Sequence, residues 1–404
     1  LILARHYDWA KGGRQEFTAV PNTPLALESR QDEEFRLGNS VIRLRRLFLS
    51  IGGAIGANLW MDSKERLVKM DIPLQRAEVF LEGFEKIEPV PELGSSGAAA
   101  VDAVDVLFPS GDHTMAGTLT LPKSRSVPLP GVVLITGSGP QNRDEDSEGP
   151  GGLKLGLFRA IAEALSGGGF AVLRYDDRGV ARSGGSFATA SMTDLEDDAR
   201  AALSFLKTRS EIDPARIGIL GHSEGAVLGA RIAVASGEVK ALVSMAGTAQ
   251  NGENILRWQL RAALSNMRLS EAEVKAAADR QESFIAAVKK AEGEVAVIEG
   301  QNVNLRWFKE FLAYDPLPTI RRLSCAVAVL QGGRDVQVPP EDARALEKAL
   351  AEAENRSCEI KIFPTLGHLF TESTGEGIAE LADARRKISP EALDFIVDFL
   401  RRKL

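Results

Sequence analysis

The stretch that decides the fold is Gly-His-Ser-Glu-Gly at residues 221–225, which follows the apolar run Arg-Ile-Gly-Ile-Leu at 216–220. An alanine-rich segment continues it at 226–235, so the pattern predicts a strand, a sharp turn and a helix. Glycines at both ends of the turn allow strand and helix to pass closer than side chains would permit. Ser223 then lies at the tip of a sheet, in front of the free N–H groups of a helix N-terminus. We therefore expect Ser223 to be a nucleophile.

A serine hydroxyl becomes an effective nucleophile only when a neighbouring base removes its proton. The chain has four histidines, and at turns of this kind the base follows the serine and the acid in sequence. Only His368 comes after the turn, whereas His222 lies beside Ser223 without facing its hydroxyl. His368 follows the strand-like run at 359–363, in a loop at the carboxyl end of a late strand. We expect His368 to be the general base.

The acid that orients the base is expected one strand earlier. Residues 326–330 form an apolar run typical of a buried parallel strand, and Asp335 follows it in a glycine-rich turn. Glu341 and Asp342 are competing carboxylates, but they begin the next helix, where acids commonly interact with the helix N-terminus. We expect Asp335 to hold the ring of His368 and to stabilise its charged form without taking the proton.

Two backbone N–H groups are expected to bind the oxyanion that forms during acyl transfer. One belongs to Glu224, the residue after the nucleophile. The other is expected from Ser138, in the loop at 136–140 that follows the apolar strand at 130–135. The glycines of this loop are also compatible with dinucleotide binding. However, the polar run at 141–146 stands where a helix would have to begin, which disfavours that interpretation.

Five motifs, met in order along the chain, carry a resemblance to a known family. They lie at residues 137–144, 174–179, 221–225, 332–335 and 367–368. Through them the chain from about residue 100 to 404 resembles bacterial carboxylesterases of the α/β-hydrolase superfamily, and in particular the EstD-type esterases with an extra N-terminal domain. The resemblance implies a mostly parallel sheet flanked by helices, with a helical cap over the active site.

The same resemblance implies an activity, the hydrolysis of short-to-medium acyl esters through an acyl-enzyme on Ser223. Serine chemistry of this kind needs no cofactor, and its partner is a small-molecule ester. Related proteins with this architecture leave two alternatives open, an acyl thioesterase and a serine exopeptidase that use the same triad. The natural ester and the oligomeric state stay open.

Composition argues against several other classes of protein. The 404 residues are 44% hydrophobic and 26% charged, and the net charge of −7 disfavours a nucleic-acid partner. The chain contains no apolar run long enough to predict a membrane span. Its histidines and cysteines lack the spacing of a zinc site, so no metal is expected. Because the first residue is Leu and not Met, we expect a processed or truncated chain, which favours a secreted or periplasmic protein.

The chain divides into two predicted domains. Residues 1–88 contain short alternating segments at 35–37, 41–45, 57–61, 66–70 and 78–81, which predict a small antiparallel β domain without catalytic residues. Residues 89–98 are rich in Pro, Gly and Ser and predict a linker. In residues 99–404, strands and helices alternate as in a doubly wound α/β domain. A helical cap is expected at about 250–318, with helices at 252–267, 270–288 and 303–314.

The two cysteines each come ten residues before a predicted member of the triad. Cys325 begins the strand before Asp335, and Cys358 begins the strand before His368. If these strands are neighbours, the two thiols lie near each other at the end of the sheet remote from catalysis. A disulfide and a pair of ordinary buried thiols are both compatible with this spacing.

Overall fold

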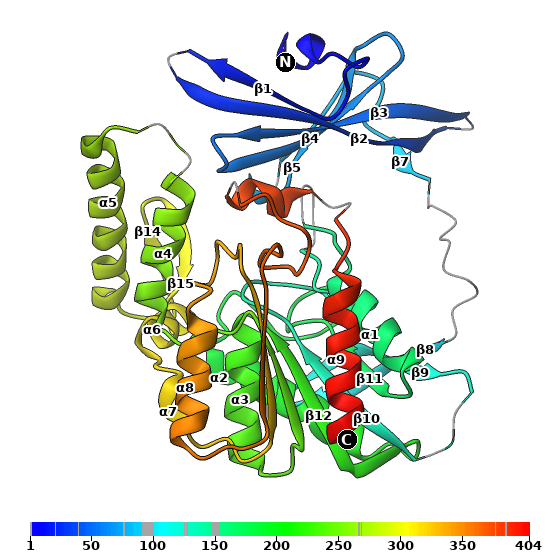
Figure 1. Ribbon diagram of the computed structural model, residues 1–404, viewed down its shortest axis with the longest axis vertical. Coiled ribbons are helices and arrows are strands. Elements are labelled where there is room, and N and C mark those ends of the chain that lie inside the picture. The colour runs from blue at the N-terminus through cyan, green and yellow to red at the C-terminus, as the bar shows by residue number, and fades with distance from the viewer. Residues whose placement is uncertain are drawn as a thin grey trace.

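Two large β-sheets, a two-stranded hairpin and a set of flanking helices make up the described part of the structure, a computed structural model (Figure 1). The structure describes residues 2–20, 22–38, 40–75, 77–90, 101–124, 126, 128–147, 153–265, 267, 269–375, 377–383 and 386–404. An antiparallel N-terminal sheet stands at one end of the molecule, and a larger mixed sheet with its helices fills the other end (Figure 1). The predicted fold class, a small antiparallel β domain followed by an α/β unit, is confirmed.

The larger sheet has the strand order β17-β16-β13-β12-β10-β11-β9-β8. Its strands are β8 (Val101–Ser110), β9 (His113–Pro122), β10 (Leu129–Ile135), β11 (Ala171–Tyr175), β12 (Ile212–His222), β13 (Ala241–Met245), β16 (Ala326–Gly332) and β17 (Cys358–Phe363). The strands from β17 to β11 pair in parallel, and β9 and β8 add antiparallel pairs at one edge. Because β10 lies between β11 and β12, the strand order reverses there, and α/β sheets bind ligands outside such a reversal.

Helices cover both faces of this sheet because its strands send side chains alternately into two apolar cores. In β10, Val133 and Ile135 join the core that α2, α3 and α8 cover, whereas Val132 and Leu134 join the core that α1 and α9 cover. These helices are α1 (Leu157–Gly167), α2 (Met192–Lys207), α3 (Glu224–Ser236), α8 (Asp342–Glu352) and α9 (Pro390–Lys403). Burial on both sides holds the strand ends, and therefore the loops that leave them, in fixed positions.

The predicted turn around Ser223 joins β12 to α3. Ser223 has φ 55° and ψ −118°, a conformation of the kind that costs on the order of 1–3 kcal/mol. A Cβ atom at position 221 would lie 2.1 Å from the carbonyl oxygen of Gly225, and a Cβ at 225 would lie 2.1 Å from that of Ile135. Glycine is therefore required at both positions, and the turn rests directly on the backbone of β10.

The segment between β13 and β16 leaves the sheet and packs over its carboxyl end. Its elements are α4 (Gly252–Ser265), α5 (Glu271–Lys290), β14 (Val295–Ile298), β15 (Gln301–Asn304), α6 (Leu305–Ala313) and α7 (Leu317–Ile320). The three helices expected here match α4, α5 and α6, but the hairpin β14–β15 was not expected. Its signal was the alternation of Val295 and Val297 before Glu299 and Gly300, both of which adopt positive φ in the turn.

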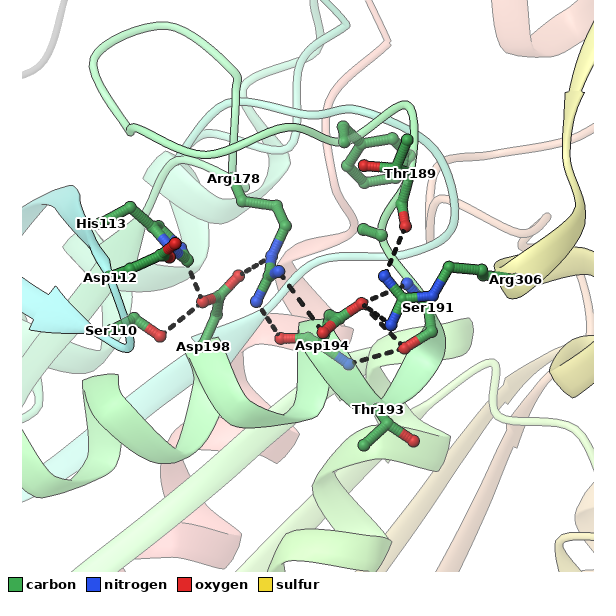
Figure 2. A network of polar contacts seen from close by, with 12 residues as sticks. Ser110, Asp112, His113, Arg178, Thr189, Ser191, Thr193, Asp194, Asp198 and Arg306 are labelled. Carbon is green, nitrogen blue, oxygen red and sulfur yellow. Dashed lines mark hydrogen bonds and ion pairs between the residues drawn. The ribbon is translucent and has the colours of Figure 1, made fainter. Parts of the chain in front are cut away.

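A polar network ties this cap segment to the body (Figure 2). Arg306, near the start of α6, lies 3.0 Å from the carboxylate of Asp194 and donates to the carbonyl oxygen of Thr189 at 3.1 Å. Further along α2, Asp198 binds Arg178 at 2.6 Å, and Arg178 belongs to the loop after β11 (Figure 2). Helix α2 thus anchors both the cap and a loop at the carboxyl end of the sheet.

The N-terminal sheet has the order β1-β2-β3-β4-β5-β6, with β7 beside β2. Its strands are β1 (Arg14–Ala19), β2 (Thr23–Leu37), β3 (Ser40–Ile51), β4 (Ile55–Met61), β5 (Leu67–Ile72), β6 (Ala77–Phe80) and β7 (Glu88–Pro89). The expected strands at 35–37, 41–45 and 57–61 lie within β2, β3 and β4, and those at 66–70 and 78–81 match β5 and β6 to within two residues. Strand β1 and most of β2 were not predicted. The chain at 28–34 is almost entirely polar, so it lacks the apolar alternation by which a strand is recognised.

This sheet packs against the segment that follows the predicted base. The short helix η3 (Ile378–Ala382) and Asp383 lie against β3 and β4. Asp383, which is 3% exposed, binds Arg46 at 3.0 Å and Arg30 at 2.7 Å. Asn58 donates to the carbonyl oxygen of Ala382 at 2.9 Å. The two sheets are therefore joined through buried polar contacts as well as through the chain.

Two further expectations concern the linker and the cysteines. Of the expected linker at 89–98, residues 91–98 lie outside the described residues, and the proposed domain boundaries stay predictions. Cys325 and Cys358 are both free thiols, and burial raises the pKa of each to about 11. Cys358 pairs across the sheet with Val327, so Cys325 lies two residues out of register with it. The disulfide alternative is not realised in this structure.

The close contact at the turn predicts a severe effect of Gly225→Ala. The added methyl would overlap the carbonyl oxygen of Ile135, so α3 and β10 would have to separate. We expect a loss of unfolding free energy of about 3 kcal/mol or more, measured by urea denaturation. Gly167→Ala is the control: it lies at the end of α1 with nothing within 4 Å of the new Cβ, and it should leave stability unchanged or raise it by up to about 1 kcal/mol. Equal stability of the two variants would contradict the prediction.

Candidate active site

The predicted nucleophile lines a cavity between the sheet and the cap. Ser223 lies in its wall together with Ser138, from the loop after β10, and Glu224, the first residue of α3. Ile255 of α4 and Phe311 of α6 form part of the opposite wall. The structure therefore brings the expected nucleophile and both expected oxyanion-hole residues to one cavity. Its cap side is largely apolar, which suits the hydrocarbon part of a small molecule.

The expected base and acid are in contact. Nδ1 of His368 lies 2.8 Å from Oδ2 of Asp335, whose side chain is fully buried. Oδ1 of Asp335 accepts the backbone N–H groups of Gln337 at 2.7 Å and Val338 at 2.9 Å, and Gln331 donates to Oδ2 at 2.9 Å. These donors fix the carboxylate, which in turn fixes the imidazole. With Nδ1 engaged, Nε2 is the nitrogen left to exchange a proton.

The two competing carboxylates have other partners. Asp342 accepts hydrogen bonds from residues 248–250 at 2.7 to 2.9 Å, so it holds the loop that follows β13. Burial raises the pKa of Asp342, against the effect of these donors. Glu341 is the N-cap residue of α8. Both residues thus serve the loop and helix around them, and Asp335 is the carboxylate in contact with His368.

The loop after β10 lies directly against the nucleophile. A Cβ atom at position 137 would lie 3.3 Å from the Cβ of Ser223. The loop is held from behind, because the hydroxyl of Thr136 donates to Asp177 at 2.8 Å and the N–H of Gly137 donates to Glu145 at 2.9 Å. This arrangement leaves Ser138 as the residue of the loop that faces the cavity with Ser223.

Two buried residues of the site were not among the expected ones. Nδ1 of His222 lies 2.7 Å from Oε1 of Glu145, and its Nε2 lies 3.0 Å from the carbonyl oxygen of His368. Sequence reasoning placed His222 beside Ser223 and gave it no role. Its partner is 77 residues away in the chain, within a run of polar residues, so the sequence held no local signal of the contact.

The side chain of Glu224 is also part of the site. It is 7% exposed, and the indole N–H of Trp307 from α6 donates to its Oε1 at 2.7 Å. Burial raises the pKa of Glu224 from 4.5 to about 7, although the Trp307 hydrogen bond and the charge of Arg231 act in the opposite direction. A carboxyl group beside the nucleophile is therefore partly protonated near neutral pH.

Within the part of the chain that the structure describes, no group of three or more His, Cys, Asp or Glu side chains is arranged to hold a metal ion. Among the same residues, none of the helices is long and apolar enough to cross a membrane. His368 and Asp335 bind each other, and Glu224 accepts the indole N–H of Trp307.

A doubly wound sheet that carries a serine on a strained strand-to-helix turn, with a buried His–Asp pair on loops at the same edge of the sheet, defines the α/β-hydrolase class. Residues 152–374, more than half of the chain, match the family model described as serine aminopeptidase, S33. The chain belongs to this family of α/β-hydrolases.

The chain is also similar to individual proteins. Esterase EstD from Thermotoga maritima is 31% identical over 264 residues, which are 65% of this chain and 59% of that protein. The chain thus spans less than two thirds of that relative's length. A solved esterase from Pyrococcus furiosus superposes with a TM-score of 0.50 at 16% identity, covering 76% of this chain and 92% of the other. A hypothetical protein from Pseudomonas aeruginosa gives a TM-score of 0.50 at 18% identity, covering 76% and 95%. These structures support the fold, and the resemblance to EstD-type esterases is confirmed.

The contact between His368 and Asp335 predicts the effect of Asp335→Asn. The amide cannot stabilise the imidazolium and can hold the wrong tautomer of the ring, so kcat for an ester substrate should fall by about 10³- to 10⁴-fold with little change in KM. Asp342→Asn is the control, since Asp342 contacts the loop after β13 and should keep kcat near the wild-type value. A severe loss in Asp342→Asn together with a mild one in Asp335→Asn would reverse the assignment of the acid.

The raised pKa of Glu224 predicts how folding stability depends on pH. An unfolded glutamic acid ionises near 4.5, whereas Glu224 in the folded protein keeps its proton up to about pH 7. The contribution of Glu224 to stability is therefore lost as the pH rises from 4.5 to 7, and this contribution is constant outside that window. Glu224→Gln cannot ionise, so its unfolding free energy relative to wild type should increase across this window by roughly 3 kcal/mol. Urea denaturation at a series of pH values measures the difference, and a difference independent of pH would contradict the burial effect.

Proposed function

We propose that the protein is a serine carboxylesterase that hydrolyses short-to-medium acyl esters through an acyl-enzyme on Ser223. The observation that carries the proposal is the 2.8 Å contact between His368 and the buried Asp335, on loops that leave the same edge of the sheet as the turn bearing Ser223. The similarity to Esterase EstD supports an ester as the substrate.

In the proposed mechanism, Nε2 of His368 takes the proton of Ser223 while Oγ of Ser223 attacks the ester carbonyl. The same nitrogen then passes the proton to the leaving alcohol, and later activates the water that releases the acid. Asp335 stabilises the imidazolium at each stage. The backbone N–H groups of Ser138 and Glu224 bind the oxyanion, an effect worth about 3 kcal/mol per donor.

The lining of the cavity supports a small neutral acyl ester. Val227 and Val338 from the body and Ile255 and Phe311 from the cap supply apolar contacts around Ser223. The amide of Gln250 adds a hydrogen-bonding group without a fixed charge. An acyl-CoA thioester is chemically open to the same triad, but it would have to bring several phosphate charges to this cap. Esters are therefore the preferred substrates.

A serine exopeptidase is the second candidate, because Glu224 brings one carboxyl group to the cavity that Ser223 lines. An ionised carboxylate there would attract the ammonium group of a peptide N-terminus. Burial opposes that ionisation by raising the pKa of Glu224 to about 7, and Trp307 already occupies one oxygen. The environment of Glu224 thus favours an uncharged substrate.

Ser223→Ala tests the proposed function. It should abolish hydrolysis of p-nitrophenyl acetate and leave the circular dichroism spectrum unchanged, because it removes only the nucleophilic oxygen. Ser236→Ala, at the far end of α3, should keep full activity. Wild-type rates on p-nitrophenyl esters of increasing chain length, an acyl-CoA and an aminoacyl p-nitroanilide rank the candidate activities. Retained ester turnover in Ser223→Ala, or a faster rate on the anilide, would overturn the proposal.

A further inference from the structure

His222 and Glu145 form a buried pair that the proposed mechanism does not use. Their side chains are 3% and 2% exposed, and Nδ1 of His222 lies 2.7 Å from Oε1 of Glu145. His222 is the last residue of β12 and directly precedes Ser223, whereas Glu145 belongs to the loop after β10. Burial of an unpaired charged group costs several kcal/mol, so the contact between the two side chains compensates for their burial.

Both ring nitrogens of His222 face hydrogen-bond acceptors. Nδ1 faces a carboxylate oxygen and Nε2 faces the carbonyl oxygen of His368 at 3.0 Å, and both of these atoms only accept hydrogen bonds. A neutral imidazole would satisfy one of them, whereas the doubly protonated ring satisfies both. Burial lowers the pKa of His222, but the charge and hydrogen bond of Glu145 outweigh burial, so the pKa is raised overall. The two contacts and the raised pKa therefore both favour the doubly protonated ring of His222 beside Glu145.

Each member of the pair also holds a loop of the site. Oε1 of Glu145 accepts the N–H of Gly137 at 2.9 Å, and Gly137 directly precedes the expected oxyanion donor Ser138. On the other side, His222 binds the backbone of His368, and the two imidazole rings lie 4.7 Å apart. The contacts therefore connect the loop of Gly137 and Ser138, called here the oxyanion loop, through Glu145 and His222 to the loop after β17 that holds His368.

We propose that Glu145 and His222 are positioning residues that set the oxyanion loop and the His368 loop at the correct places relative to Ser223. The inference rests on the proposed function, and it assigns neither residue a contact with substrate. Its physical basis is that the two loops come from β10 and β17, which lie on opposite sides of β12 in the sheet. One side chain at the end of β12 reaches the loop of His368 directly and the loop of Gly137 through Glu145.

A purely structural pair would have a different signature from a positioning pair. Loss of a structural pair lowers the fraction of folded protein and leaves each folded molecule fully active. Loss of a positioning pair lowers kcat in the molecules that are folded, because misplacing a reacting group by about 1 Å can cost 100-fold. Since the alcohol and acyl groups of the substrate still contact the cavity walls, KM should change much less than kcat.

The test compares Glu145→Ala, His222→Ala, the double variant and Glu145→Gln on p-nitrophenyl acetate, with the concentration of competent Ser223 counted by fluorophosphonate labelling. Each alanine variant should lower kcat per labelled site by about 10- to 100-fold with KM within about threefold of wild type. The double variant should be no worse than the more damaged single one, because the pair acts as a unit. Glu145→Gln keeps an oxygen for Gly137 and should recover at least half of the loss on a logarithmic scale.

Glu33→Ala is the matched control. Glu33 is also a buried glutamate that accepts a ring N–H, from Trp60 at 2.9 Å, but it lies in the N-terminal sheet. This variant should lose stability and keep kcat per labelled site. Wild-type kcat in Glu145→Ala and Glu145→Gln, or additive losses in the double variant, would overturn the positioning role. Absence of ester turnover in the wild-type protein would instead count against the proposed function, and the two failures are therefore distinguishable.

Discussion

The close approach of three backbone segments at Gly221, Gly225 and Ile135 is the constraint on which the rest of the site depends. With no side chains between them, β12, α3 and β10 meet at distances that only glycine permits, and Ser223 is held with φ 55° in consequence. Its N–H is engaged by the carbonyl oxygen of Met245 at 2.8 Å, so the turn is fixed on the β13 side as well. The strain of the turn is sustained by apolar strands buried on both faces, and these strands hold the nucleophile in a fixed position.

Sequence reasoning predicted the local structure correctly where a single short segment determines that structure by itself. The turn at 221–225, the apolar strand before Asp335 and the late loop of His368 each show their chemistry locally, and the structure brings Asp335 and His368 into contact as expected. It failed where the cause lies in a distant partner. The pairing of Glu145 with His222 depends on two loops meeting, and most of β2 is defined by its neighbours in the sheet and not by its own composition. The hairpin β14–β15 has a local signal, but its alternation of apolar and other residues is only four residues long and therefore weak.

The N-terminal sheet is joined to the body through buried charged side chains, which are stable in the interior only when they are paired. Asp383 is 3% exposed and Arg46 is 1% exposed, so water does not solvate either charge in the folded chain. The ion pair between them offsets the cost of burying these charges, and separation of the two parts of the molecule would break it. The segment that carries Asp383 follows the His368 loop, and the N–H of Ser389 at its far end donates to the carbonyl oxygen of Phe370 at 2.8 Å. The expected β domain without catalytic residues is thus in contact with the stretch of chain that returns from the base.

Four buried carboxyl groups lie on or beside the loops at the carboxyl end of the sheet, where the turn of Ser223 also lies, and their partners give them different chemistry. Asp335 receives backbone and amide N–H groups and faces the base, whereas Glu145 faces the second imidazole. Glu224 receives a single indole N–H, and burial raises its pKa to about 7; burial also raises the pKa of Asp177, which the hydroxyl of Thr136 opposes. Two of the four are therefore matched to an imidazole and two are biased toward the neutral acid. This division limits the net negative charge near the place where the oxyanion must form. Four ionised carboxylates at the site would repel the oxyanion and oppose its formation.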